Sequence, residues 1–258
     1  MDYCSIPRVS NSDLTRLQEE YLGRGTAPSA RFAANNSNAV RESTDRQSVG
    51  RAFRHHLVGP ESVGSVIQQL LPDMAFSKTA ELEPLMPLLR RDSFCKRYLQ
   101  LAEQNGAQQN AIQGTAQRNR IVLFTEPMTE VACKARLDVV YTSAQRQNAL
   151  IIDFKTTSAQ SQSQFLQSCY DYDYDRQAAY YLDALRFAEG RGNQRGEWSQ
   201  TRHFRFVLVG IQKQEPNRLF AVDATAIPEF IDYGRKKYRF WLRKWQEREQ
   251  EQMWLKAS

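Results

Sequence analysis

The pattern of side chains between positions 131 and 155 constrains the fold of this chain more than any other feature. Side chains of a β-strand alternate between its two faces. From Val131 to Val139 the odd positions are apolar, and the even positions carry Lys134, Arg136 and Asp138. The pattern predicts a strand with one buried face and with Asp138 on the opposite, polar face.

A second strand with the same alternation follows closely. Its even positions from 150 to 154 are apolar, whereas Asp153 and Lys155 occupy the other face. The polar segment 142–148 between the two strands has the length of a hairpin loop. An antiparallel hairpin would place Asp138 and Asp153 side by side.

Two neighbouring carboxylates and a lysine are the groups that metal-assisted phosphodiester hydrolysis needs. Carboxylate oxygens suit Mg²⁺, which lowers the pKa of a bound water and stabilises charge on phosphate oxygens. Lys155, on the same face as Asp153, can orient or deprotonate that water, or stabilise negative charge. The residues alone leave an alternative open, because an Asp-x-Lys pair also occurs by chance on surface hairpins.

Three blocks, in this order along the chain, resemble the PD-(D/E)XK nuclease superfamily. They are Arg136-Leu137-Asp138, then Asp153-Phe154-Lys155-Thr156-Thr157, then residues 174–181 with their Gln-Ala-Ala-Tyr-Tyr ending. The resemblance is to the RecB-like branch, and within it to the RecE-type exonucleases (exodeoxyribonuclease VIII). It implies an α/β fold with a restriction-endonuclease-like core, in which helices flank a central mixed β-sheet.

The same resemblance implies a ligand set for Mg²⁺ or Mn²⁺. Asp138, Asp153 and one histidine of an upstream Gly…His…Pro motif would bind the ion, with the backbone carbonyl of Phe154 as a further ligand. The histidine is His55 or His56, because adjacent residues on a helix point about 100° apart and only one of them faces the site. We favour His55, although the usual position of the family's histidine carries an arginine here.

The resemblance also suggests roles for other residues. Lys155 and Gln177 would act in catalysis, and Gln177 shares a helix face with Tyr181 through its i,i+4 spacing. The alternative for this helix is that its tyrosines only pack in the core. Glu126 has a counterpart in the family, with a role left open. Contacts to DNA are expected from Arg136, Thr156 and Tyr181.

The formal net charge of +6 comes from one segment. Residues 233–245 carry six cations and no acid, and their aromatic residues follow helical spacing. Localised positive charge is typical of phosphate-binding surfaces, so DNA contacts are predicted at Arg235, Lys236 and Arg239. The competing interpretation is an ordinary solvated helix face.

Length and pattern predict one large domain over 49–258, preceded by a polar arm over 1–48 that is not an independent domain. Helices and strands alternate along the domain: helices at 61–71, 81–105, 163–170, 175–189 and the C-terminal segment, strands at 120–126, 130–141, 149–155, 203–211 and 218–222, and loops at 104–117 and 190–200.

Cellular context follows from what the pattern lacks. The four cysteines are widely scattered, which argues against zinc. Some RecB-like relatives hold an iron–sulfur cluster through cysteines near the C-terminus, and because no cysteine follows Cys169, the resemblance implies a branch without the cluster. The absence of a membrane-spanning apolar run and of a secretory pattern predicts a cytoplasmic, nucleoid-associated protein with no membrane partner.

These observations predict a metal-dependent deoxyribonuclease, most nearly an exonuclease that acts on duplex ends in recombination or repair. The resemblance adds a homo-oligomer and a single-strand annealing or recombination partner. One alternative is a structure-specific endonuclease of repair or defence on the same fold. Another is a non-catalytic DNA-binding relative, which the presence of Asp138, Asp153 and Lys155 disfavours. No glycine-rich phosphate loop supports a nucleotide-processing enzyme.

Overall fold

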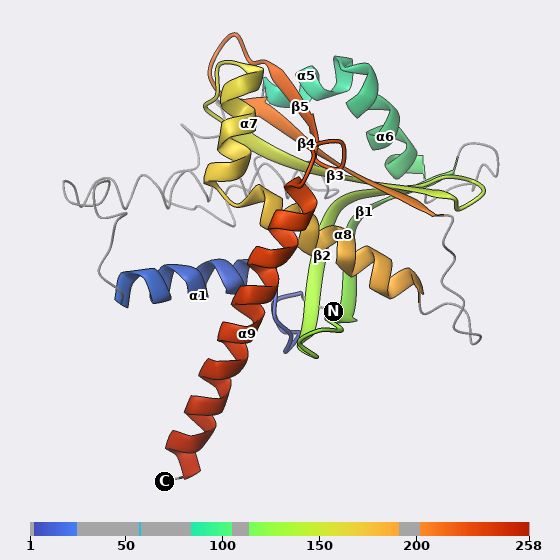
Figure 1. Ribbon diagram of the computed structural model, residues 1–258. Coiled ribbons are helices and arrows are strands. Elements are labelled where there is room, and N and C mark those ends of the chain that lie inside the picture. The colour runs from blue at the N-terminus through green and yellow to red at the C-terminus, as the bar shows by residue number, and fades with distance from the viewer. Residues whose placement is uncertain (1–2, 25–56, 58–83, 105–113, 191–201, 258) are drawn as a thin grey trace.

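A mixed five-stranded sheet forms the centre of the computed structural model, which describes residues 3–24, 57, 84–104, 114–190 and 202–257 (Figure 1). The strands lie in sequence order: β1 (Thr115–Thr125), β2 (Ala132–Thr142), β3 (Asn148–Thr157), β4 (His203–Gln212) and β5 (Leu219–Asp223). Only the β3–β4 pair is parallel among them. The predicted α/β class with helices around a mixed sheet is confirmed.

Helices cover both faces of this sheet. One face of the sheet, here called the α8 face, packs against α1 (Asn11–Arg24), α7 (Gln162–Asp171), α8 (Tyr174–Gly190) and α9 (Phe230–Ala257). The α6 face packs against α5 (Leu85–Arg91) and α6 (Ser93–Gln104), together with Leu57. Two apolar clusters therefore enclose the sheet, and β3 contributes alternate side chains to each of them.

Some boundaries differ from those expected. The helix predicted at 81–105 is two helices, because Asp92 has an extended backbone and its Oδ1 accepts a hydrogen bond from Cys95 N at 2.8 Å. β1 begins at Thr115, inside the predicted loop. The predicted helix at 61–71 lies outside the described residues.

The described part of the predicted N-terminal arm packs onto the domain. Val9 forms a parallel bridge with Cys133 at the edge of β2, and α1 follows with Leu14 and Leu17 buried. Among the helices that the structure describes, none is both long and apolar enough to span a lipid bilayer.

The alternation of faces along β2 slips by one residue at Asp138. Leu137 packs in the α8-face cluster, Val139 in the α6-face cluster and Val140 again in the α8-face cluster. On β1 the residue opposite this point, Asn119, has a left-handed backbone with φ 52°. The prediction that every odd position from 131 to 139 shares one face is therefore wrong at Val139. The prediction of Asp138 on a polar face opposite Leu137 is wrong as well, because Asp138 is buried and lies opposite Asp153, on the side of the sheet that Val140 and Ile151 also face.

Helix α9 crosses the start of α8 at very close range. A β-carbon on Gly234 would lie 2.0 Å from the carbonyl oxygen of Asp175, so only glycine permits this approach. Among the aromatic residues of α9 with helical spacing, Phe230, Tyr238 and Trp241 are buried and Trp245 is partly buried.

We therefore expect Gly234→Ala to lower the free energy of unfolding by about 2 kcal/mol, because the added methyl group forces the two helices apart. Gly23→Ala is the matched control. Its β-carbon would meet nothing within 4 Å, and alanine in an exposed helix is favoured by about 1 kcal/mol. Urea denaturation followed by circular dichroism measures both values. Equal stability of the two variants would contradict the packing described here.

Candidate active site

Asp153 and Lys155 lie on the same face of β3 and form a buried ion pair. The Lys155 Nζ atom is 2.6 Å from Asp153 Oδ2, and the side chain of Asp153 is fully buried. Neither oxygen of Asp153 accepts a hydrogen bond from any residue that the structure describes, so the lysine pairs with Oδ2 by charge rather than by an aligned hydrogen bond. The carboxylate thus keeps unused acceptor capacity.

Asp138 is held beside Asp153 by the backbone of β3. Antiparallel pairing between β2 and β3 runs as far as Val139 and Ile152, and the next step along both strands brings Asp138 opposite Asp153. Instead of a further ladder bond, Asp138 Oδ2 accepts a hydrogen bond from Phe154 N at 3.1 Å. The predicted hairpin therefore brings the two acids together, and the face slip at Asp138 lies within the site itself.

Helix α8 holds the lysine from the other side. Lys155 Nζ donates a hydrogen bond to Gln177 Oε1 at 2.5 Å, and Gln177 Nε2 donates to the Tyr181 hydroxyl at 3.1 Å. The ammonium also lies 4.7 Å from the centre of the Tyr174 ring. Three different groups therefore fix the position of this cation.

Tyr174 is a site residue that sequence reasoning missed. Its signal was present, because Tyr174 precedes Gln177 by three residues and so shares its helix face. The motif drew attention to the amide and to the later tyrosine, whereas contact of the ring with Lys155 depends on how α8 packs on the sheet.

The donor set fits a hard divalent cation. Buried carboxylate oxygens without hydrogen-bond donors are costly unless a cation satisfies them. Asp138 and Asp153 would supply the protein ligands. Within the described ranges no group of three or more potential metal-ligating side chains occurs. His55 and His56 lie outside the described residues, and the Phe154 carbonyl stays a prediction.

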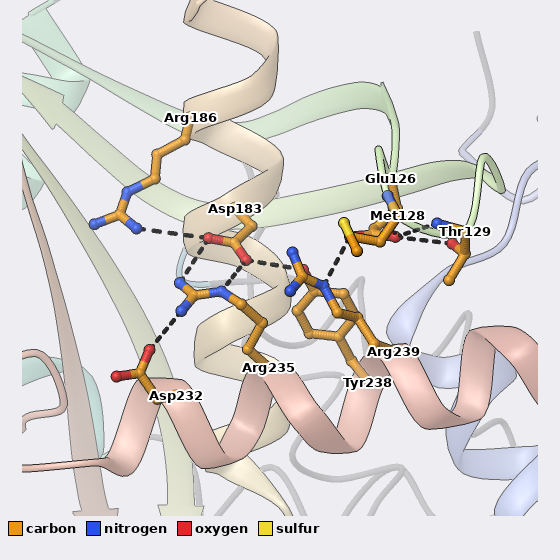
Figure 2. A network of polar contacts seen from close by, with 9 residues as sticks. All are labelled: Glu126, Met128, Thr129, Asp183, Arg186, Asp232, Arg235, Tyr238 and Arg239. Carbon is orange, nitrogen blue, oxygen red and sulfur yellow. Dashed lines mark hydrogen bonds and ion pairs between the residues drawn. The ribbon is translucent and has the colours of Figure 1, made fainter. Parts of the chain in front are cut away.

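Glu126 serves the fold at a distance from these acids. Its Oε2 accepts hydrogen bonds from Thr129 N at 2.8 Å and from Met128 N at 3.0 Å, and its Oε1 pairs with Arg239 at 2.9 Å (Figure 2). Glu126 is seven residues beyond Asn119, the neighbour of Asp138, which is about 23 Å along a strand. It therefore organises the β1–β2 turn and anchors α9.

The cations of α9 are largely committed to acids within the protein. Arg235 donates to both oxygens of Asp183, at 2.6 and 2.9 Å, and these hydrogen bonds raise the pKa of Arg235 (Figure 2). Arg239 pairs with Glu126, as described above. Both arginines of the expected phosphate-binding face are thus paired with acids of the protein. The sequence does not indicate these pairs, because the acids come from distant parts of the chain. Lys236 is exposed and pairs with no acid that the structure describes.

The other expected DNA contacts lie in varied surroundings. The Arg136 guanidinium lies 5.2 Å from the centre of the Tyr3 ring, and its side chain is half-buried. Thr156 follows Lys155 on β3 and is half-buried. Tyr181 is buried and contacts the site through Gln177.

Comparison with known proteins identifies the fold family. The family model described as a PDDEXK-like domain of unknown function (DUF3799) matches residues 11–257. Among curated proteins no sequence match is found.

Two solved structures share only a distant likeness. A "Putative exonuclease" from Eubacterium rectale aligns with a TM-score of 0.46 and 12% identity over 78% of this chain and 65% of that one. The chain thus spans less than two thirds of that protein. The structure of a protein called SSO0001 aligns with a TM-score of 0.29 and 14% identity over 88% of this chain and 84% of that one.

A metal at Asp138 and Asp153 would stabilise the folded protein. Mn²⁺ at about 100 times its dissociation constant adds about 2.7 kcal/mol to the folded state, which raises the melting temperature by about 5 °C or more. We expect Asp153→Asn to abolish this rise and the exposed-site change Glu249→Gln to retain it. Differential scanning calorimetry measures both. A rise that persists in Asp153→Asn would place the ion elsewhere.

Proposed function

The chain belongs to the PDDEXK-like family whose model covers residues 11–257, and from this premise we propose that it is a Mg²⁺- or Mn²⁺-dependent deoxyribonuclease. The observation that carries the proposal is the buried acid pair beside a fixed lysine. Asp153 has no hydrogen-bond donor among the described residues, and Asp138 is tied to the same strand by Phe154 N.

The residues of the site divide the work of hydrolysis. A divalent ion bound there would supply a water of lowered pKa and charge to stabilise the phosphate. Asp138 and Asp153 would hold that ion at a fixed place, because both carboxylates sit on paired strands. Lys155 would orient the attacking water or stabilise charge that develops on the phosphate oxygens.

Gln177 would act as a positioning residue for Lys155. Its amide oxygen accepts from the lysine, and its amide nitrogen is used by Tyr181, so the amide is held in one orientation. A lysine with fewer restraints would spend less time in the reactive geometry, and small displacements cost large factors in rate.

Within this activity we favour an exonuclease acting on duplex ends in recombination or repair. The support is the resemblance of the Asp138, Asp153–Thr157 and Gln177–Tyr181 blocks to RecE-type exonucleases. The same resemblance leads us to propose a homo-oligomer that acts with a single-strand annealing or recombination partner. A structure-specific endonuclease on this fold is the second candidate, and closed circular DNA distinguishes the two.

The first test is digestion of end-labelled linear duplex and of covalently closed circles with Mg²⁺ or Mn²⁺. We expect loss of linear DNA alone, no activity in EDTA, and a decrease of about 10²–10³-fold in Lys155→Ala. Lys96→Ala, an exposed lysine on α6, is the matched control. Cutting of circles would favour the endonuclease, and the absence of any metal-dependent cleavage would refute a nuclease.

A second test separates positioning from binding. Gln177→Ala is expected to lower kcat about 10²-fold with little change in KM, because the lysine loses its acceptor while the acids stay in place. Gln100→Ala, an exposed glutamine on α6, should behave like the natural protein. Steady-state kinetics on a linear duplex gives both parameters. A change confined to KM would show that Gln177 binds substrate instead.

A further inference from the structure

Four tyrosines surround the turn between α7 and α8, and we call them the tyrosine rim: Tyr170, Tyr172, Tyr174 and Tyr233. Three of them are exposed, at 39% for Tyr170, 69% for Tyr172 and 54% for Tyr233. Single exposed apolar residues are common on protein surfaces, but three exposed rings at one place form a patch of the kind that marks an interaction site. Tyr174 packs partly against the core, whereas the other three rings present surface to solvent.

The rim begins at the catalytic lysine. The ring of Tyr174 lies against Lys155 Nζ, and the Tyr172 ring centre is 5.9 Å from that of Tyr174, with an interplanar angle of 33°. Tyr172 therefore carries an aromatic surface from the site out to solvent. On the other side, the Tyr170 ring contacts Phe230 of α9 edge-on, at 5.1 Å between centres.

The turn that presents these rings is rigidly held. Asp173 has a left-handed backbone with φ 54° and accepts hydrogen bonds from Gln18 at 3.1 Å and from Lys237 at 2.7 Å. Burial opposes ionisation of Asp173, but these bonds and the charge of Arg176 lower its pKa below the ordinary value. Helices α1 and α9 thus both fasten the turn.

Lys237, which binds Asp173 in the turn, also contacts Tyr233 of the rim. Lys237 Nζ, which donates to Asp173, also lies 4.8 Å from the centre of the Tyr233 ring. Lys236 beside it is exposed. Lys237 is paired with Asp173, so Lys236 is the cation of the two that stays available to a phosphate. Exposed aromatic rings accompanied by cations are an arrangement by which proteins bind single-stranded nucleic acid, with bases stacked on the rings.

We propose that the tyrosine rim stacks unpaired bases of the DNA strand whose phosphate lies at Asp138, Asp153 and Lys155. This inference rests on the proposed function and names its substrate class. Inside a duplex both faces of each base are covered by its neighbours, so an unpaired base offers more free surface for stacking on Tyr172. The protein would therefore prefer DNA with a single-stranded end to a blunt duplex.

Fluorescence anisotropy in EDTA tests the proposal without cleavage. The probes are a labelled single-stranded oligonucleotide and a blunt hairpin duplex. We expect Tyr172→Ala to raise the dissociation constant for the single strand about ten-fold and to leave that for the duplex unchanged. Tyr172→Phe keeps the ring and should bind within about two-fold of the natural protein.

Tyr21→Ala is the matched control, because Tyr21 is also exposed, at 51%, but lies on α1 outside the rim. Its dissociation constants should equal those of the natural protein. A 2-aminopurine base in the single strand gives a second readout. Its fluorescence should be quenched on binding to the natural protein and to Tyr172→Phe, but not on binding to Tyr172→Ala.

Three outcomes would overturn the proposal that the rim stacks unpaired bases. They are unchanged single-strand affinity in Tyr172→Ala, an equal loss of affinity for single strand and duplex, and no single-strand binding by the natural protein. Cleavage in Mg²⁺ by the same proteins separates this from the nuclease proposal. Metal-dependent cleavage together with unchanged single-strand binding in Tyr172→Ala would refute base stacking on the rim and support the nuclease proposal. Single-strand binding that depends on Tyr172, without any metal-dependent cleavage, would support base stacking on the rim and refute the nuclease proposal.

Discussion

The ion pair between Lys155 and Asp153 is the interaction on which the arrangement of the site depends. A carboxylate taken fully out of water costs several kcal/mol unless its charge and its lone pairs are satisfied. Here the lysine satisfies the charge, but no described residue donates a hydrogen bond to either oxygen. A buried polar group left in this state calls for an explanation, and a cation-binding role supplies one. Asp153 is held on one side by pairing with Leu208 of β4, and on the other side Asp138 accepts a hydrogen bond from the next residue of the strand, Phe154.

Two helices outside the sheet restrain the Lys155–Asp153 pair. Helix α8 supplies the acceptor and the ring that hold Lys155, so the position of α8 decides the position of the cation. Helix α9 in turn holds α8, through the close contact at Gly234 and through the pairing of Arg235 with the buried Asp183. Helix α9 contacts neither Lys155 nor the two acids, but by holding α8 it fixes where the lysine lies.

The sequence predicts the site well where a local period decides the structure. Asp153 and Lys155 follow from alternation along β3, Asp138 follows from the register of the hairpin, and Gln177 follows from its place in the motif. The face slip at Asp138 could not be foreseen, because no local pattern marks it, and it lies opposite the left-handed backbone of Asn119 on the neighbouring strand. The roles of the α9 arginines were missed for a similar reason, since Asp183 and Glu126 come close only in three dimensions.

A run of cations in a sequence is therefore a poor measure of a DNA-binding surface. The segment 233–245 accounts for the whole net charge, yet Arg235, Lys237 and Arg239 all bind acids of the domain. Neutralised in this way, they position helices and the α7–α8 turn instead of attracting phosphates. At these three cations, recognition of a DNA strand would therefore depend less on long-range attraction than on the acid–lysine site and on stacking. Lys237 shows the two roles joined, because the bond that neutralises it also fixes the turn that presents Tyr172.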